Sequence, residues 1–220
     1  MIEKRAVLWD LDGVLMDTYE LHYRSWVFAF GEVGVSFSLE QFQPTFGVNN
    51  RATILKMLGE ERGMKLADQI DQHKEQWFRD HIAGNVPLFP GVLEWLKRFK
   101  EWGFPQAVAS SGQQATIDAQ VDGVGIRPYF DAVISGSQLP PKPNPDVFLL
   151  AAKTVRMPIK KCLVIEDSLA GATAGVRAGA KVLAVETTLP GSALTIANQV
   201  VYRLDRFTPQ DAAELLGLRL

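Results

Sequence analysis

A chain of 220 residues with 47% hydrophobic and 22% charged residues has the balance of a globular protein, either one large domain or a core with a smaller insertion. Its formal net charge of -2 argues against a surface for nucleic acid or anionic membrane, and no segment implies a protein partner. No apolar stretch approaches the roughly 20 residues of a membrane span, and no secretory signal pattern is present, so we expect a cytoplasmic protein.

The first predicted strand covers residues 5–9, where a short apolar run is typical of a strand buried on both faces. Four helix-like segments then follow one another without a strand between them, at residues 21–30, 39–46, 52–58 and 64–82. We interpret residues 17–87 as an inserted helical cap, with hinges near residues 15–17 and 84–87. An insertion at the carboxyl end of a strand can cover the crevice in which α/β folds bind ligands.

Strands and helices alternate through the rest of the chain. Strands are predicted at residues 106–109, 132–134, 162–165 and 182–185, and helices at residues 92–102, 113–121, 145–153 and 168–177. This alternation predicts an α/β domain with a doubly wound parallel sheet, formed by residues 1–16 and 88–220. The tail, residues 191–220, shows no clear pattern.

Two carboxylates, Asp10 and Asp12, follow the first predicted strand in the segment VLWDLDGVLMDT. An EF-hand loop that began at Asp10 would need Gly and Glu where the chain has Leu15 and Leu21, so this reading fails. A tight turn explains Asp12 and Gly13. It does not explain Asp10, which directly follows an apolar run and would be costly to bury without a partner.

A second pair of acids, Glu166-Asp167, ends the strand predicted at residues 162–165. If this strand and the first strand are neighbours, their carboxylates converge at one edge of the sheet. Crowded carboxylates repel one another, and their pKa values rise unless a cation lies between them. Mg²⁺ prefers a few carboxylates together with waters and substrate phosphate, so the sequence predicts a magnesium site.

Two further segments suit a phosphate group. Ser110-Ser111-Gly112 follows a predicted strand and offers hydroxyl and amide groups where the next helix begins. Lys142 lies in PPKPNPD, where the prolines stiffen the loop that presents its ammonium group. Each segment alone is common in ordinary loops. Their occurrence in this order, together with the acids at strand ends, indicates a metal-and-phosphate site.

These motifs resemble those of the haloacid dehalogenase-like phosphohydrolases. DLDGVLMDT resembles the first motif, Ser110 in AVASSG the second, Lys142 in KPNPD the third, and Glu166-Asp167 in VIEDSLAG the fourth. Together the motifs span residues 10–171, in the order of that family. The resemblance is greatest to the branch of β-phosphoglucomutase and small sugar-phosphate phosphatases, in which a helical cap follows the first motif on a Rossmann-like core.

The resemblance implies catalysis through an aspartyl-phosphate. Asp10 would attack phosphorus, and Asp12 would protonate the leaving oxygen and then activate water for the second step. Mg²⁺ would be held by Asp10, by the backbone carbonyl of Asp12, by Asp167, and by Glu166 either directly or through water. Because a dehalogenase is expected to lack the second acid and the metal, Asp12 argues against dehalogenation.

The resemblance also implies the residues that bind the substrate. Ser110 and Lys142 would hold the phosphoryl oxygens while charge redistributes. The other expected substrate contacts are Ser111, Gly112, Thr18, His22 and Arg51. For His22, a helix-surface or hinge contact is an equal alternative, and Arg51 lies one residue out of register with a mutase arginine that grips a second phosphate. For Lys74, a solvated helix face is favoured over a substrate contact.

The mutase pattern places a lysine and an asparagine three and four residues after Ser110, where this chain has Gln113 and Gln114. Because a mutase holds two anionic groups, loss of this cation favours a phosphatase. We expect a Mg²⁺-dependent phosphatase that acts on a small phosphorylated metabolite such as a sugar phosphate. The alternatives are a β-phosphoglucomutase-like phosphosugar mutase and a non-catalytic sensor of phosphometabolites. A signalling receiver domain would be about half as long and would lack the cap.

Overall fold

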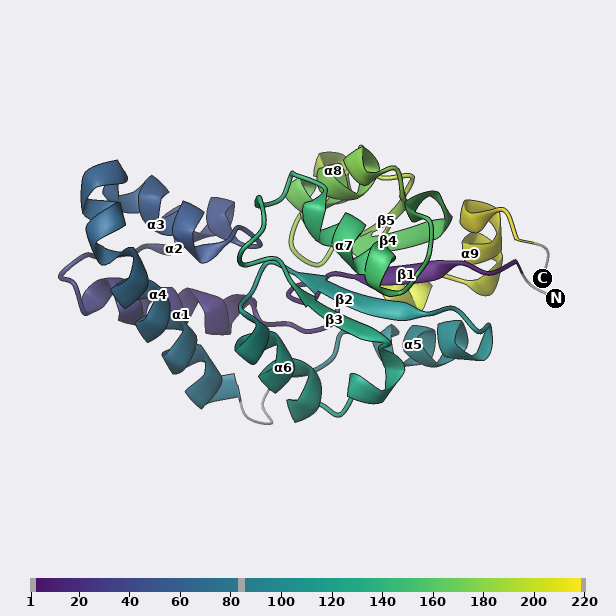
Figure 1. Ribbon diagram of the computed structural model, residues 1–220, viewed down its shortest axis with the longest axis horizontal. Coiled ribbons are helices and arrows are strands. Elements are labelled where there is room, and N and C mark those ends of the chain that lie inside the picture. The colour runs from purple at the N-terminus through teal and green to yellow at the C-terminus, as the bar shows by residue number, and fades with distance from the viewer. Residues whose placement is uncertain (1–2, 83–85, 219–220) are drawn as a thin grey trace.

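The computed structural model describes residues 3–82 and 86–218. A sheet with helices on both faces lies beside a block of helices along the long axis of the molecule (Figure 1). None of the described helices combines the length and apolarity needed to cross a bilayer.

The sheet of the described residues has six strands, all parallel, in the order β3-β2-β1-β4-β5-β6. The strands are β1 (Ala6–Trp9), β2 (Gln106–Ser110), β3 (Ala132–Ser135), β4 (Cys162–Glu166), β5 (Lys181–Val185) and β6 (Gln199–Val201). Trp9 at the end of β1 is in register with Val108 on one side and Ile165 on the other. The segments that follow β1, β2 and β4 therefore leave the sheet at one edge, at the point where the strand order reverses.

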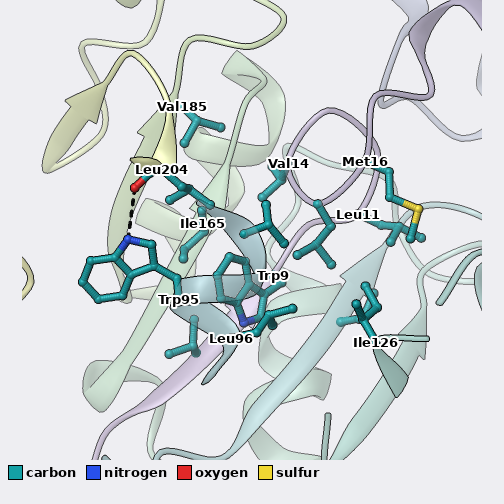
Figure 2. Packing of buried hydrophobic residues seen from close by; sticks show 14 of the residues in the cluster. Trp9, Leu11, Val14, Met16, Trp95, Leu96, Ile126, Ile165, Val185 and Leu204 are labelled. Carbon is teal, nitrogen blue, oxygen red and sulfur yellow. Dashed lines mark hydrogen bonds between the residues drawn. The ribbon is translucent and has the colours of Figure 1, made fainter. Parts of the chain in front are cut away.

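Helices cover both faces of the sheet, which confirms the predicted doubly wound architecture (Figure 1). One face packs against α5 (Val92–Glu101), α6 (Gln114–Gly123) and α9 (Pro209–Leu216), and the other against α7 (Asp146–Thr154) and α8 (Leu169–Ala178). Figure 2 shows the core on the first face, where Trp9 and Trp95 are buried. The Trp95 indole donates a hydrogen bond of 3.0 Å to the carbonyl of Leu204, so its polar atom is satisfied inside the core.

The helical block consists of α1 (Tyr19–Gly31), α2 (Leu39–Phe42), α3 (Asn50–Leu58) and α4 (Glu60–Ile82). It has its own apolar cluster, which includes Trp26, Phe30, Phe42 and Ile70. The two connections to the sheet run together, because Met16 forms an antiparallel bridge with Leu88. All four helices fall within the proposed cap, residues 17–87, although positions 84 and 85 of the second predicted hinge lie outside the described residues.

Short 3₁₀ helices complete the described structure, at Gln43–Thr45, Arg127–Tyr129, Ile159–Lys161, Gly191–Ala193 and Leu204–Arg206. The first of them corrects the helix predicted at residues 39–46. The α-helix ends at Phe42 because Pro44 has no N–H to donate to the preceding turn. Strand β6 and helix α9 lie in the tail, where no element was predicted.

Candidate active site

The predicted convergence of acids is present at the carboxyl edge of the sheet. Asp10 follows β1, and its backbone N–H donates to the Ile165 carbonyl of β4 at 3.0 Å. Glu166 ends β4 and Asp167 follows it. One carboxylate oxygen from each of Asp10, Glu166 and Asp167 lies within 4.8 Å of the others, and all three residues are buried.

Lys142 contributes a positive charge to this cluster. Its Nζ donates to Asp10 Oδ1 at 2.5 Å and to Glu166 Oε1 at 2.6 Å, and the residue is buried. The other oxygen of Glu166 accepts the backbone N–H groups of Asp167 and Ser168, both at 2.9 Å. Glu166 is thereby held in place by charge-assisted hydrogen bonds. The third predicted motif thus lies beside the first and the fourth.

The electrostatics of the cluster favour a further cation. Burial raises the pKa of Asp10 to about 8, with Lys142 opposing the shift and Glu166 adding to it. Burial also raises the pKa of Asp167 well above its usual range, and the charges of Glu166 and Asp10 raise it further. A hard divalent ion with oxygen ligands would relieve this crowding, so the donor set fits Mg²⁺.

Two glycines leave room for these carboxylates. A Cβ added at Gly13, whose φ is +84°, would lie 2.1 Å from an oxygen of Asp167. A Cβ at Gly171 in α8 would lie 1.7 Å from Glu166 Oε1. Both distances are far below van der Waals contact. The first turn after β1 and the first turn of α8 can therefore approach the acids only because these residues have no side chain.

The side chain of Asp12 is bound by residues outside this cluster, from the segment before α1 and from α6. Its Oδ1 accepts hydrogen bonds from Thr18 Oγ1 and from Gln120 Nε2 of α6, both at 2.7 Å. His22 Nε2 of α1 lies 3.1 Å from the same oxygen, although the two groups are not aligned as a hydrogen bond. Burial would raise the pKa of Asp12, but the charge of His22 and these donors outweigh it and hold the pKa below its usual range.

The serine motif occupies the end of β2 and the approach to α6. Ser110 is buried, and its Oγ accepts the backbone N–H of Gly112 at 3.1 Å. Ser135 of the neighbouring strand fixes the loop, since its Oγ donates to the Gly112 carbonyl at 2.6 Å. Ser111 and Gly112 line the same cavity as Asp12. This position between strand and helix suits an anion, as the sequence predicts.

An open cavity lies between the sheet edge and the helical block. Polar and small residues among those that line it are Asp12, His22, Ser111, Gly112 and Gln120. Aromatic rings from the helical block line it as well, those of Trp26, Phe42 and Phe46. The mixture of apolar rings with a few converging polar groups is typical of a site for a small molecule.

The structure does not bring Arg51 to this cavity. Arg51 is exposed on α3, where its guanidinium contacts the sulfur of Met64 and lies 3.8 Å from Asp68. It lines a neighbouring pocket together with Ser111 and Gln113, so its assignment as a substrate contact stays a prediction. The shift of one residue in register, already visible in the sequence, matches this outward position.

The expectation of a solvated Lys74 is wrong. Lys74 of α4 is 2% exposed, lines the cavity, and donates to Glu75 Oε1 at 2.7 Å. Sequence reasoning missed the pair because two adjacent opposite charges on a polar helix are usually solvent-exposed. It also missed Gln120, and Thr188, whose hydroxyl donates to Asp167. Thr188 shortly follows β5, so its place near a strand end was the available signal.

Comparisons with known proteins agree with this geometry. A family model for haloacid dehalogenase-like hydrolases matches residues 7–185. The fructose-1-phosphate phosphatase YqaB of Escherichia coli is 30% identical over 191 residues, which cover 81% of this chain and 95% of YqaB. The Arabidopsis thaliana protein SUPPRESSOR OF QUENCHING 1, chloroplastic, is 35% identical over 209 residues. That match covers 91% of this chain but 19% of the plant protein, so the chain corresponds to a small part of it.

Solved structures share the fold. β-Phosphoglucomutase from Clostridium difficile superposes with a TM-score of 0.83 at 23% identity and covers 98% of both chains. A mutant of CbbY from Rhodobacter sphaeroides, in complex with xylulose-(1,5)bisphosphate, has a TM-score of 0.84 at 24% identity, covering 94% of this chain and 96% of its own. Together with the family match and the relatives at 30% identity or more, these findings show that the chain belongs to the haloacid dehalogenase-like hydrolases, in the β-phosphoglucomutase and sugar-phosphatase-like branch.

Proposed function

We propose that the protein is a Mg²⁺-dependent phosphatase that hydrolyses a small phosphorylated metabolite, such as a sugar phosphate, through an aspartyl-phosphate at Asp10. The chain is a hydrolase of a family whose named relatives include phosphatases. The observation that carries the proposal is the meeting of Asp10, Glu166 and Asp167 with Lys142, while Asp12 faces the cavity. Phosphoryl transfer needs this combination of nucleophile, positive charge and neighbouring acid.

The reaction proceeds in two displacements at phosphorus. In the first, a carboxylate oxygen of Asp10 forms a bond to phosphorus, the ester P–O bond breaks, and Asp12 gives its proton to the leaving oxygen. In the second, Asp12 takes a proton from water, which attacks the same phosphorus and frees Asp10 and inorganic phosphate. Ser110 and Lys142 hold the phosphoryl oxygens throughout.

The surroundings of Asp12 suit its part in the second displacement. The lowered pKa keeps Asp12 ionised, which is the form that accepts a proton from water. For the first displacement Asp12 must carry a proton. The negative charge of a bound phosphate ester raises the pKa of a neighbouring carboxyl group, so substrate binding favours this form.

Mg²⁺ would be held by Asp10, Asp167 and the backbone carbonyl of Asp12, with Glu166 binding directly or through water. When bound, the ion supplies positive charge that keeps the carboxylates ionised and stabilises the phosphoryl oxygens. Asp10 also needs one oxygen free for phosphorus, which leaves Asp167 as the acid most dedicated to the metal.

A panel of sugar and nucleotide monophosphates, assayed with Mg²⁺ and with EDTA, tests the proposed function. We expect release of inorganic phosphate from sugar phosphates with Mg²⁺ and loss of that release with EDTA. Interconversion of glucose 1-phosphate and glucose 6-phosphate without net phosphate release would establish the mutase instead. Absence of turnover across the whole panel would contradict both and support a sensor.

Substitution of Asp167 by Ala should raise the Mg²⁺ concentration needed for half-maximal activity by on the order of 100-fold, because a dedicated metal ligand is lost. Stabilisation by Mg²⁺, measured as a shift in Tm without substrate, should shrink in parallel. Asp68→Ala is the matched control, since the Asp68 side chain is fully exposed on α4. An unchanged Mg²⁺ requirement in Asp167→Ala would remove Asp167 from the ligands.

A further inference from the structure

The cap-side wall of the cavity contains a buried ion pair. Lys74 and Glu75 are adjacent in α4, are 2% and 1% exposed, and both line the cavity. Lys74 Nζ donates to Glu75 Oε1 at 2.7 Å. Glu75 also accepts from Asn50 Nδ2 at 2.7 Å and from the hydroxyl of Thr116 in α6, a helix of the sheet domain that packs against α4. Glu75 is thus held from both sides of the boundary between cap and core.

The ammonium group of Lys74 has more N–H donors than it has hydrogen bonds. An ammonium group carries three donors, and within the part of the chain that the structure describes Lys74 Nζ donates to Glu75 alone. The rings of Trp26 and Phe78 lie 5.6 and 5.2 Å from Nζ, so much of its other surroundings is aromatic. Because buried donors need acceptors, the remaining N–H groups of Lys74 are available to an oxygen of a molecule in the cavity.

The ion pair has no net charge. Burial alone would raise the pKa of Glu75, but the charge of Lys74 and the donors around the carboxylate lower it to about 2, so Glu75 is ionised. The place where the mutase pattern has a lysine holds Gln113, whose amide donates to the Asp71 carboxylate at 2.7 Å. Gln113 lines a neighbouring pocket together with Arg51, and in the cavity wall itself the charge of Lys74 is balanced by Glu75.

We infer that the Lys74–Glu75 pair determines substrate specificity by admitting the uncharged, hydroxyl-bearing body of a sugar monophosphate and rejecting a second phosphate. The inference rests on the proposed phosphatase function and defines its substrate class. A second phosphate would bring negative charge into a buried site where the charge of Lys74 is already balanced by Glu75, and burial of an unpaired charge is costly. A sugar hydroxyl needs only a donor and an acceptor, and the pair supplies both.

The fold itself does not exclude a bisphosphate, because a mutant of CbbY with the same fold holds xylulose-(1,5)bisphosphate. The exclusion would come from the charges of this chain, in particular from Glu75. Glu75 is therefore the residue whose substitution tests the inference. A Gln at this position keeps the shape and one accepting oxygen, removes the negative charge, and leaves the positive charge of Lys74 without its partner.

The experiment compares kcat/KM for fructose 1-phosphate and fructose 1,6-bisphosphate. We expect the wild-type protein to prefer the monophosphate by tenfold or more. In Glu75→Gln the ratio of the two values should shift toward the bisphosphate by tenfold or more. Glu61→Gln is the matched control, because Glu61 lies on the same helix, pairs with Lys65 at 2.9 Å and is 89% exposed. Its ratio should equal that of the wild-type protein.

Two further measurements separate the possible failures. Release of phosphate from 4-nitrophenyl phosphate reports on the chemistry without a sugar body. The double variant Lys74→Gln/Glu75→Gln has a wall without net charge, so it should show the monophosphate preference again. If the aryl phosphate is hydrolysed but wild-type protein turns over both sugar phosphates equally, the inference is overturned while the proposed function stands. An equal loss for both sugar phosphates in Glu75→Gln would overturn it too. No phosphate from any of these compounds would overturn the proposed function and the inference together.

Discussion

Replacement of Asp10 by Asn should lower kcat by about 10⁴-fold or more, which is the scale seen when a catalytic nucleophile is removed. An amide oxygen is a poor nucleophile toward phosphorus, so no phosphorylated enzyme should form. The fold should persist, because Asn fits the same space and its substitution removes one of three crowded carboxylates. Mass spectrometry of enzyme quenched during turnover should detect a phosphoryl group on wild-type protein and none on the variant.

The control for this experiment is Asp68→Asn, because the Asp68 side chain is fully exposed on α4. It should retain wild-type kcat and the phosphorylated intermediate. A fully active Asp10→Asn protein would contradict the assignment of the nucleophile and with it the aspartyl-phosphate route. Loss of activity together with a lowered Tm would indicate a structural role for Asp10, so the Tm of each variant belongs in the same experiment.

The sheet domain was predictable from the sequence because its central strands are buried on both faces. In a chain of this composition, continuous apolar runs such as residues 162–165 are typical of strands covered by helices on each side. β6 has only three residues, all half-buried at the sheet edge, and so carries no such run. α9 did have a signal, since Thr208 and Asp211 form a capping box around Pro209. That signal stands alone in a tail without other patterns.

The acids of the candidate site were predictable for a related reason. A residue that directly follows a buried parallel strand has a nearly fixed position, so the neighbourhood of Asp10 and Asp167 follows from strand order alone. In the helical block no strand end fixes the positions of the side chains. Lys74 and Glu75 face the cavity because α4 packs against α1, α3 and α6, tertiary contacts that the local sequence does not encode. Arg51, in the first turn of α3, lies at the surface, and the local sequence does not specify this position either.

Replacement of Asp12 by Ala should lower turnover of a sugar phosphate by about 10²- to 10⁴-fold, the usual contribution of a general acid–base group. Mg²⁺ affinity should change little, because only the backbone carbonyl of Asp12 is assigned to the metal. The side chain is instead held by Thr18 and Gln120. 4-Nitrophenyl phosphate should form the phosphorylated enzyme nearly as before, since its leaving group needs no proton.

The two displacements should therefore respond differently to the loss of Asp12. With the aryl phosphate, water still lacks its base in the second displacement, so phosphorylated Asp10 should accumulate in Asp12→Ala and decay slowly. Rapid-quench measurement of the intermediate, together with Mg²⁺ titration followed by Tm, gives both quantities. Asp12→Asn is the companion variant, because it keeps an oxygen for Thr18 and Gln120 while removing the acid–base function. Equal losses of Mg²⁺ affinity and turnover in these variants would overturn the acid–base role, since a group that only positions the metal cannot discriminate between leaving groups.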